Sequence, residues 1–377
     1  MELDSRILKY LDDHTQEALD LLVELAQIPA PSNHEEKRAE FCKNWLEAQG
    51  AQGVYIDEVL NVVYPVGCTD DNPVVIFSAH SDVVFPDTDP LPLRIENDRI
   101  YCPGIGDDTA SVVALLMTAK YIAQNKLTPK DCGMLIVVNA AEEGLGNLRG
   151  TRNIMADFGD RVREFISFDS SIDKYVRTAV GSRRYKVEVT TEGGHSYGAF
   201  GNRNAIAYLA SLIDTLYTIK VPDQGKTTYN VGLISGGTSV NTIAQNAEML
   251  YEYRSDHREA LEIMENHFRS AIDFYRAKGI GINVTLLGER PCNGEIDPIR
   301  QQRLEDRCIA AGSKYYGREI TFIPSSTDCN IPLSMGIPAV CVGCRAGGGV
   351  HTREEYVLID SLAPGLKVVA ELMLYHF

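Results

Sequence analysis

The sequence lacks the features that mark membrane, secreted and nucleic-acid-binding proteins. No apolar stretch approaches the ~20 residues of a membrane span, and residues 1–28 are charged, without the uninterrupted apolar segment of a signal peptide. Basic side chains are scarce, since 36 Lys and Arg stand against 52 Asp and Glu, a net charge of −16. Nucleic acids and anionic membranes attract basic surfaces, so neither is an expected partner. The sequence predicts a cytoplasmic protein.

The cysteines form no disulfide framework, because there are nine of them and they are scattered. Cys341 and Cys344 have the spacing of a zinc or redox pair. No second pair lies nearby, and the two fall in the apolar run 339–344, which favours packing in a buried strand. Internal repeats and low-complexity tracts are also missing.

What the chain has is enough length for two domains, with 377 residues of which 44% are hydrophobic. The first 180 residues predict alternating helices and strands, the pattern of an α/β fold. Helices are expected over 5–28, 33–50 and 109–125. Strands are expected over 54–59, 61–66, 73–79, 133–140 and 164–168, with a short hairpin in the proline-rich segment 85–101.

From about residue 181 the pattern changes. Strands are predicted over 184–191, 228–234, 247–254 and 280–287, and helices over 202–219 and 257–278. The resulting β-α-β-β-α-β order is that of ferredoxin-like (α+β) domains. The α/β pattern then resumes with a helix over 298–316, strands over 320–323 and 339–342, and a helix over 360–375. We therefore expect a domain of residues 181–290 inserted into a discontinuous domain of residues 1–180 and 291–377.

The most informative stretch is 134–144, which reads M-L-I-V-V-N-A-A-E-E-G. Its apolar part predicts a strand buried on both faces, as in a parallel sheet. The strand leads into Glu142 and Glu143, at the carboxyl end where such sheets place their ligand sites. Two carboxylates there need a cation or a solvated cleft, and one could hold a metal while the other moves protons. Taken alone, such a pair is more often an exposed loop after a strand, and the rest of the chain is what favours a site.

Further metal-ligating side chains follow other strands and turns. His80 and Asp82 share a face of an extended segment, Asp107 and Asp108 begin a helix that they could simply cap, and Asp169 ends a strand. His351 follows three glycines and could be a loop residue. Together these side chains suffice for two metal ions ~3.5–4 Å apart. Nitrogen and oxygen donors without thiolate suit zinc, with cobalt or manganese as substitutes.

The chain resembles the zinc metallopeptidase family of peptidase T, aminoacylase, carboxypeptidase G and succinyl-diaminopimelate desuccinylase. The resemblance spans essentially the whole chain. It rests on H-S-D at 80–82, G-I-G-D-D at 104–108, E-E-G at 142–144, Asp169, G-G-H-S at 193–196, S-V-N-T-I at 239–243, Y-R-S at 253–255 and His351 followed by Glu355. It implies a three-layer, zinc-exopeptidase-like catalytic domain with an inserted lid that also forms a homodimer.

The resemblance also implies roles for single residues. His80 and Asp169 would hold one zinc, Glu143 and His351 the other, and Asp107 would bridge both, joined to Asp108 by a cis peptide. Glu142 would be the general base and acid, and Asp82 would orient His80. From the lid, His195, Asn241 and Arg254 would contact substrate, with His195 supplied by the partner chain. The amides of Gly347, Gly348 and Gly349 could bind a substrate carboxylate together with Arg254.

Alternatives remain for the lid residues. Arg254 could form a surface salt bridge, and His195 could belong to a tight solvated turn. Departures from the family pattern occur at Thr109-Ala110, after His195, and at Ala244.

The sequence thus predicts a two-zinc hydrolase of a peptide or N-acyl amide bond. A peptidase T-like aminopeptidase is the first expectation, and an N-acyl-amino-acid amidohydrolase is the alternative. A rival of another class is a non-catalytic, metal-bound scaffold that dimerises through its lid. The expected substrate is a small peptide or an N-acyl amino acid.

Overall fold

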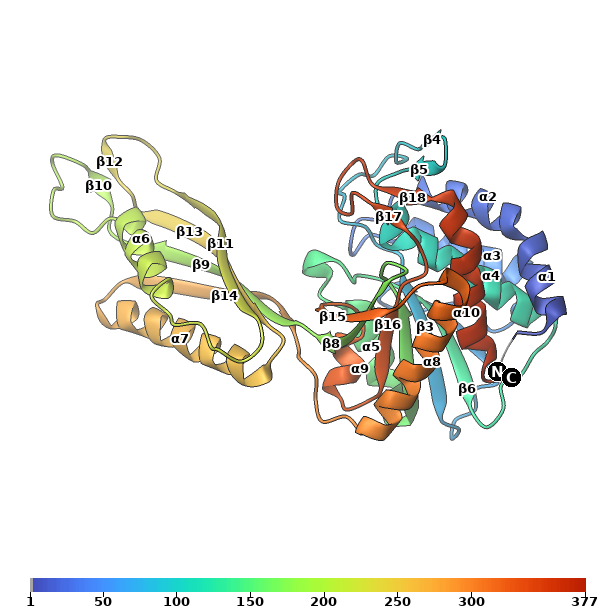
Figure 1. Ribbon diagram of the computed structural model, residues 1–377. Coiled ribbons are helices and arrows are strands. Elements are labelled where there is room, and N and C mark those ends of the chain that lie inside the picture. The colour runs from blue at the N-terminus through green and yellow to red at the C-terminus, as the bar shows by residue number, and fades with distance from the viewer. Residues whose placement is uncertain (1–2) are drawn as a thin grey trace. The chain divides into compact units, whose positions relative to one another are not determined.

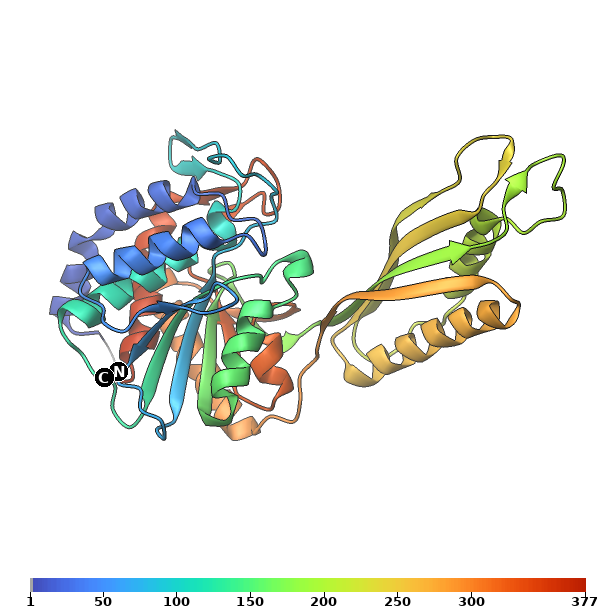
Figure 2. The same cartoon turned by 180° about the vertical axis from the view of Figure 1, so that it is seen from behind.

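The computed structural model describes residues 3–377, which form two compact units (Figures 1 and 2). The larger unit consists of the chain up to Ala179 and from Gly294 onward, and the smaller one is Val180–Asn293. Each unit has its own hydrophobic core and is described by itself. No helix within residues 3–377 combines the length and apolar character that crossing a bilayer requires.

The larger unit is built on an eight-stranded mixed sheet of order β1-β2-β6-β3-β7-β16-β8-β15. Its central strands β6, β3, β7 and β16 are parallel to one another, whereas β1, β2 and β8 introduce antiparallel pairs. Every residue of β3 and β6 is buried, as expected for strands covered on both faces. The strands are β1 Tyr55–Ile56, β2 Val62–Val66, β3 Val74–His80, β6 Gly133–Asn139, β7 Val162–Phe168, β8 Lys174–Ala179, β15 Thr321–Ser325 and β16 Ala339–Val342.

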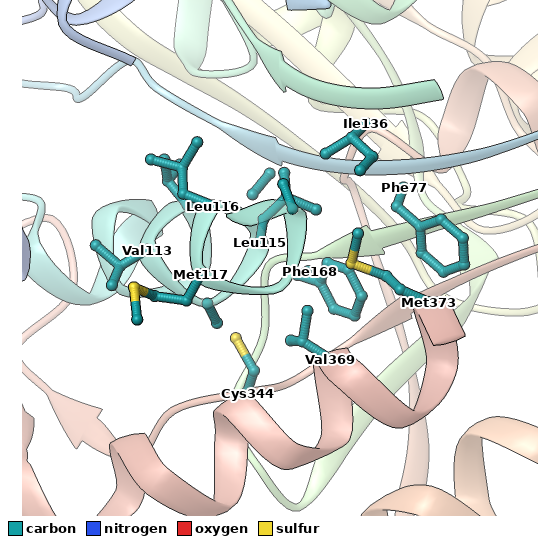
Figure 3. Close-up of a cluster of buried hydrophobic side chains, with 14 of the residues drawn as sticks. Phe77, Val113, Leu115, Leu116, Met117, Ile136, Phe168, Cys344, Val369 and Met373 are labelled. Carbon is teal, nitrogen blue, oxygen red and sulfur yellow. The ribbon is translucent and has the colours of Figure 1, made fainter. Parts of the chain in front are cut away.

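Helices cover both faces of this sheet, so the unit has three layers and the predicted α/β architecture is confirmed. On one face, Phe77, Ile136 and Phe168 pack against α4 and α10 (Figure 3). On the other face, alternate residues of the same strands, such as Ile76 and Leu135, pack against α5 and α9. The first layer comprises α1 Ser5–Asp13, α2 Thr15–Ala26, α3 Glu36–Ala48, α4 Ala110–Gln124, α8 Pro298–Tyr316 and α10 Leu362–Leu374, and the opposite one α5 Arg149–Phe158 and α9 Asn330–Ser334.

A small antiparallel sheet connects a hairpin from the first part of the larger unit to segments near the end of the chain. Its order is β17-β18-β5-β4, and it joins the predicted hairpin to the glycine-rich segment before His351. Its strands are β4 Arg94–Glu96, β5 Arg99–Tyr101, β17 Gly347–Gly348 and β18 Tyr356–Leu358.

The smaller unit has the expected β-α-β-β-α-β order and a four-stranded antiparallel sheet, β11-β13-β9-β14. Helices α6 and α7 cover one face, where Leu209 and Phe268 share a core with Val187 and Met249 of the sheet. A two-stranded sheet, β10 with β12, extends from it. The elements are β9 Gly181–Thr190, β10 Gly194–His195, α6 Ala205–Leu216, β11 Thr227–Gly236, β12 Thr242–Ile243, β13 Asn246–Ser255, α7 Arg258–Ala277 and β14 Gly281–Arg290.

Several elements differ from the sequence prediction. The helix expected over 5–28 is two helices, because His14 leaves the helical conformation and its Nδ1 lies 2.7 Å from the Tyr10 carbonyl oxygen. The strand expected over 54–59 is only Tyr55–Ile56. Helices α5 and α9 and strand β8 were not predicted. All nine cysteines are free, and Cys341 and Cys344 are buried.

Candidate metal centre

His80 lies at the carboxyl end of β3 and is completely buried. Its Nδ1 is 3.1 Å from the backbone oxygen of Asp82 and 3.4 Å from the Asp82 Oδ1 atom. Its Nε2 is 3.0 Å from Asp107 Oδ1 and 3.9 Å from Asp169 Oδ1. One side of the imidazole is therefore held by Asp82, and the other side faces two carboxylates.

Asp107 lies between two imidazoles. While its Oδ1 atom faces His80, its Oδ2 atom is 3.2 Å from Nε2 of His351. The same His351 nitrogen is 3.0 Å from Oε1 of Glu143. The structure thus brings together His80, Asp107, His351 and Glu143 from four separate segments, with the two oxygens of one carboxylate directed to different sides.

Asp82 connects His80 to the Glu142–Glu143 loop. This fully buried carboxylate accepts hydrogen bonds from the backbone N–H of Glu142 at 2.9 Å and of Glu143 at 3.0 Å. It also accepts one from the hydroxyl of Ser32 at 2.6 Å. The position of the two glutamates is therefore set by the same group that orients the His80 ring.

The loop that carries Asp107 is fixed by Glu355, a buried carboxylate from the end of the chain. Glu355 accepts hydrogen bonds from the backbone N–H groups of Gly104, Gly106 and Asp107 at 2.8–3.1 Å. Arg345 donates to the Gly106 carbonyl at 2.7 Å. A Cβ atom at Gly106 would lie 3.1 Å from Glu355 Oε1, so a side chain there would press on the carboxylate that holds the loop. The Asp107–Asp108 peptide bond is cis.

Two sets of side chains have donor atoms within 4.8 Å of one another: His80, Asp107 and Glu143, and His80, Asp108 and Asp169. The second set contains Asp108 where the resemblance implies Asp107. Asp108 is buried, and its Oδ2 atom already accepts a hydrogen bond from the backbone N–H of His80 at 3.1 Å. Both oxygens of Asp107 instead face imidazole nitrogens, so Asp107 is the better placed of the two to ligate a metal.

Burial and the proximity of like charges shift the pKa values of the cluster. Burial, together with the charges of Asp107 and Asp108, raises the pKa of Asp169 well above its usual range. Burial also raises the pKa of Glu143 to about 7, although His351 donates to it. Hydrogen bonding to Asp107 and Glu143 raises the pKa of His351 to about 10. Carboxylates gathered away from water are stable together only when positive charge is shared among them.

Glu142 is buried beside this cluster, and its backbone N–H is bonded to Asp82. Its charge contributes to raising the pKa of Glu143, of Asp169 and of Asp328. Glu142 is therefore close to the cluster without belonging to either set of converging donor atoms.

Two supporting carboxylates were not found from the sequence. Glu35 is fully buried and accepts a hydrogen bond at 2.9 Å from the backbone N–H of Ala141, the residue before Glu142. Asp328 is fully buried and accepts hydrogen bonds from Thr151 at 2.5 Å and from Asn139 at 2.7 Å. The one sequence signal for Asp328 as a site residue was its position shortly after a strand, since it lies beyond the end of β15 as Asp169 lies beyond the end of β7.

The remaining predicted residues lie elsewhere. Gly348 ends β17, three residues before His351. His195, Asn241 and Arg254 belong to the smaller unit. His195 is exposed on β10, beside Asn241, whose carbonyl accepts a hydrogen bond from the N–H of Ser196 at 2.9 Å. Arg254 is on β13 and forms an ion pair with Glu252 at 3.1 Å.

The carboxyl edge of this α/β sheet gathers two imidazoles and several carboxylates, the donor groups of a metal-binding enzyme site. A sequence profile of the peptidase family M20/M25/M40 matches residues 76–375. The chain belongs to this family of hydrolytic metalloenzymes.

Individual relatives are distant. The chain is 26% identical over 256 residues to a peptidase M20 domain-containing protein of Schizosaccharomyces pombe, covering 65% of this chain but only 62% of that protein. It is 23% identical to an acetylornithine deacetylase of Aliivibrio fischeri, covering 88% of this chain and 89% of the relative. A tripeptidase structure from Staphylococcus aureus superposes with a TM-score of 0.76 at 22% identity, over 95% of this chain and 97% of the other.

Proposed function

We propose that this protein is a two-zinc hydrolase that cleaves the amide bond of a small peptide. The observation that carries the proposal is the position of Asp107, with its two carboxylate oxygens 3.0 and 3.2 Å from the Nε2 atoms of His80 and His351. A carboxylate between two imidazoles suits a bridging ligand. His80 and Asp169 would complete one site, and Glu143 and His351 the other.

The residues present fit zinc. The proposed ligands supply only imidazole nitrogens and carboxylate oxygens, the donors that zinc accepts, and cobalt or manganese could replace it. Burial and neighbouring negative charges raise the pKa values of Asp169 and Glu143, and a nearby cation would favour their charged forms, which supports the proposal. When bound, two zinc ions supply an acidified water nucleophile and polarise the amide carbonyl.

Glu142 is the proposed general base and acid. It lies beside the ligands, and Asp82 fixes its backbone. Its carboxylate would accept a proton from the attacking water and pass that proton to the leaving amine nitrogen. Asp82 orients His80, since it faces the Nδ1 side of the ring and leaves Nε2 to the metal.

His195 is suited to donate a hydrogen bond to the developing oxyanion. Its Nδ1 accepts hydrogen bonds from the backbone N–H groups of Tyr197 at 3.3 Å and Gly198 at 3.2 Å. In a neutral ring this places the proton on Nε2. The exposed side of the imidazole is then a donor, which oxyanion stabilisation requires.

The smaller unit supports a homodimer in which His195 acts on the partner chain's substrate. Arg254 lies eight residues along β13 from Asn246, which marks the end of the sheet near His195. At ~3.3 Å per residue this separation is about 26 Å, longer than a tripeptide. One substrate could contact both residues only if they came from different chains. Three exposed apolar side chains near His195 would be covered in such a dimer, Tyr197 at 90%, Phe200 at 91% and Val240 at 102% exposure.

A peptidase T-like aminopeptidase is the first candidate, supported by the structural similarity to a tripeptidase. An N-acyl-amino-acid amidohydrolase is the second, supported by the similarity to an acetylornithine deacetylase. In either case Arg254 and the amides around Gly348 would bind a substrate carboxylate, and Asn241 would lie beside His195. We place the enzyme in the cytoplasm, in keeping with its free cysteines.

The decisive experiment is a hydrolysis screen of the zinc-loaded protein. Tripeptides and dipeptides with free amino termini are compared with N-acetyl and N-succinyl amino acids. Preferential cleavage of tripeptides is expected. Cleavage of only the acylated amino acids would replace the first candidate by the second, and cleavage of neither would favour a non-catalytic scaffold.

The dimer is tested by mixing two inactive variants under verified subunit exchange. His195→Ala chains lack the donor, and Glu142→Gln chains lack the base. A heterodimer has one site with an intact Glu142 and an intact partner His195, so activity should partly return. An active monomer, or no recovery, would contradict the arrangement.

A further inference from the structure

A hollow of about 480 Å³ lies in the larger unit, at the amino-terminal edge of its sheet. It is lined by Val75 near the start of β3, by residues 163–164 of β7, by Pro338 before β16, by α8 and by Tyr375 and His376. The candidate metal centre is at the opposite edge, because His80 ends β3 and Asp169 follows β7. From Val75 to His80 the strand rises ~17 Å. The hollow is therefore separate from the hydrolytic site.

Four arginines line this hollow, and the guanidinium groups of three of them have no carboxylate partner within residues 3–377. Arg163 donates to the backbone carbonyl of Asp131 at 3.0 Å. Arg300 donates to the backbone carbonyl of Arg163 at 2.6 Å. Arg303 makes neither a hydrogen bond nor an ion pair with the residues that the structure describes.

The fourth arginine belongs to the floor of the hollow. Arg307 forms an ion pair with Glu164, and His376 lies 3.3 Å from the same carboxylate. Asp306 is the second carboxylate in the lining and accepts a hydrogen bond from Gln302 at 2.8 Å. Four arginines against two carboxylates leave two positive charges in excess, before any charge on His376.

This excess stands out in a chain with 52 acidic and 36 basic side chains. Neighbouring guanidinium groups repel one another, and of the four only that of Arg307 is paired with a carboxylate among residues 3–377. The arginines come from two segments far apart in the sequence, β7 and α8, and are brought together only by the fold. Their planar forks match the oxygens of phosphate and carboxylate groups, and phosphate carries the higher charge.

We propose that this hollow binds a small molecule bearing a phosphate group, with Arg163, Arg300 and Arg303 contacting the phosphate oxygens. The volume lies within the ~300–1,000 Å³ range of small-molecule sites and leaves room for an organic part beside the phosphate. Apolar side chains of Val75, Leu304 and Pro338 are available to that part. The site is independent of the proposed hydrolytic function.

The test is calorimetric titration of the metal-loaded protein with inorganic phosphate and with AMP, at ionic strength held constant with sodium chloride. Saturable binding of at least one probe is expected in the wild type. The Arg300→Ala/Arg303→Ala variant should bind it at least tenfold more weakly. Both positions are exposed on a helix that tolerates alanine, and circular dichroism checks that the variant folds.

The matched control is Arg6→Ala/Arg318→Ala, which removes the same charge from two exposed positions outside the hollow. It should bind as the wild type does. Stronger binding of AMP than of inorganic phosphate would identify a phosphate monoester as the ligand class, and the reverse would identify free phosphate. Absence of binding to both probes would overturn the proposal. Equal weakening of binding in Arg300→Ala/Arg303→Ala and in Arg6→Ala/Arg318→Ala would also overturn it. A third contrary result would be that Asp107→Asn loses binding while Arg300→Ala/Arg303→Ala retains it.

Discussion

Replacing Asp82 by alanine should damage both stability and metal binding, because one buried carboxylate serves several groups. The substitution removes the acceptor of the backbone N–H groups of Glu142 and Glu143 and leaves the Nδ1 side of His80 without its carboxylate. Each buried group left without a partner costs ~1–3 kcal/mol. His80 Nδ1 keeps the backbone oxygen of residue 82, so the groups that lose their acceptor are the two N–H groups and the part-buried hydroxyl of Ser32. Partly offset by the removal of a buried charge, these three groups give an expected loss of ~3–6 kcal/mol. That is a large part of the ~5–15 kcal/mol by which domains are stable.

The sequence provides a convenient probe for this measurement. Trp45 is the single tryptophan and lies in α3 of the larger unit, so its fluorescence reports unfolding of the unit that contains Asp82. Urea unfolding of metal-free protein would give the free energy of unfolding. Asp82→Asn retains one acceptor oxygen and should lose about half as much. The control Asp71→Ala changes an exposed carboxylate and should have little effect.

Metal affinity should fall with stability, by the ~10–100-fold that is typical when a residue orienting a ligand is lost. An Asp82→Ala protein that unfolds within ~1 kcal/mol of the wild type would refute the reasoning. It would mean that water or a rearranged loop satisfies the groups that Asp82 holds.

Three further predictions separate the roles of the site residues. Glu142→Gln should lower kcat by ~10²–10⁴ with unchanged metal content, whereas Glu143→Gln should lose metal; normal turnover of Glu142→Gln would exclude it as the base. Glu355→Gln weakens the acceptor of three backbone N–H groups around Asp107. It should therefore lower both the metal affinity and the urea midpoint of unfolding measured by Trp45 fluorescence, and no change in either would show that the loop does not depend on Glu355. Metal affinity should rise with pH between 5 and 8, because metal binding must displace protons from His351, whose pKa is raised to about 10, and from Glu143, whose pKa is raised to about 7. Titration calorimetry in buffers of different ionisation enthalpy measures the protons released, and a metal affinity independent of pH would contradict this prediction.

The strands and helices that the sequence predicts well are those with a strong pattern of their own. Helix α8 was predicted to the residue, with Pro298 at its start and Gly317 after its end, and so was β16. Helix α5 was missed because it begins Arg-Gly after two residues in the left-handed conformation, Asn147 and Leu148. Helix α9 is only five residues long, too short to show a period.

His80, Glu143 and Asp169 could be proposed as ligands because the carboxyl ends of parallel strands meet at one edge of a sheet, whereas Asp107 and His351 were proposed from the family resemblance. Asp82 was predicted as the support of His80, but the supporting hydrogen bonds of Glu355 and Glu35 were not, because they join distant segments. Glu355 bonds to N–H groups about 250 residues away, and Glu35 to one 106 residues away. A backbone N–H has no sequence signature, so nothing local marks the carboxylate that will accept from it.

The interrupted course of the larger unit determines when, during synthesis, a metal site can exist. Residues up to Ala179 supply His80, Asp107, Glu143 and Asp169, but His351 and the Glu355 that fixes Asp107 are translated after the whole smaller unit. The smaller unit is continuous, so all of its residues have been translated before the second part of the larger unit begins at Gly294. Strand β16, which pairs with β7 beside β3, and helix α10, which covers Phe77 and Phe168, arrive last. A nascent chain therefore carries these four acidic and imidazole side chains in an open sheet. The larger unit closes around them only when its final 40 or so residues have been added.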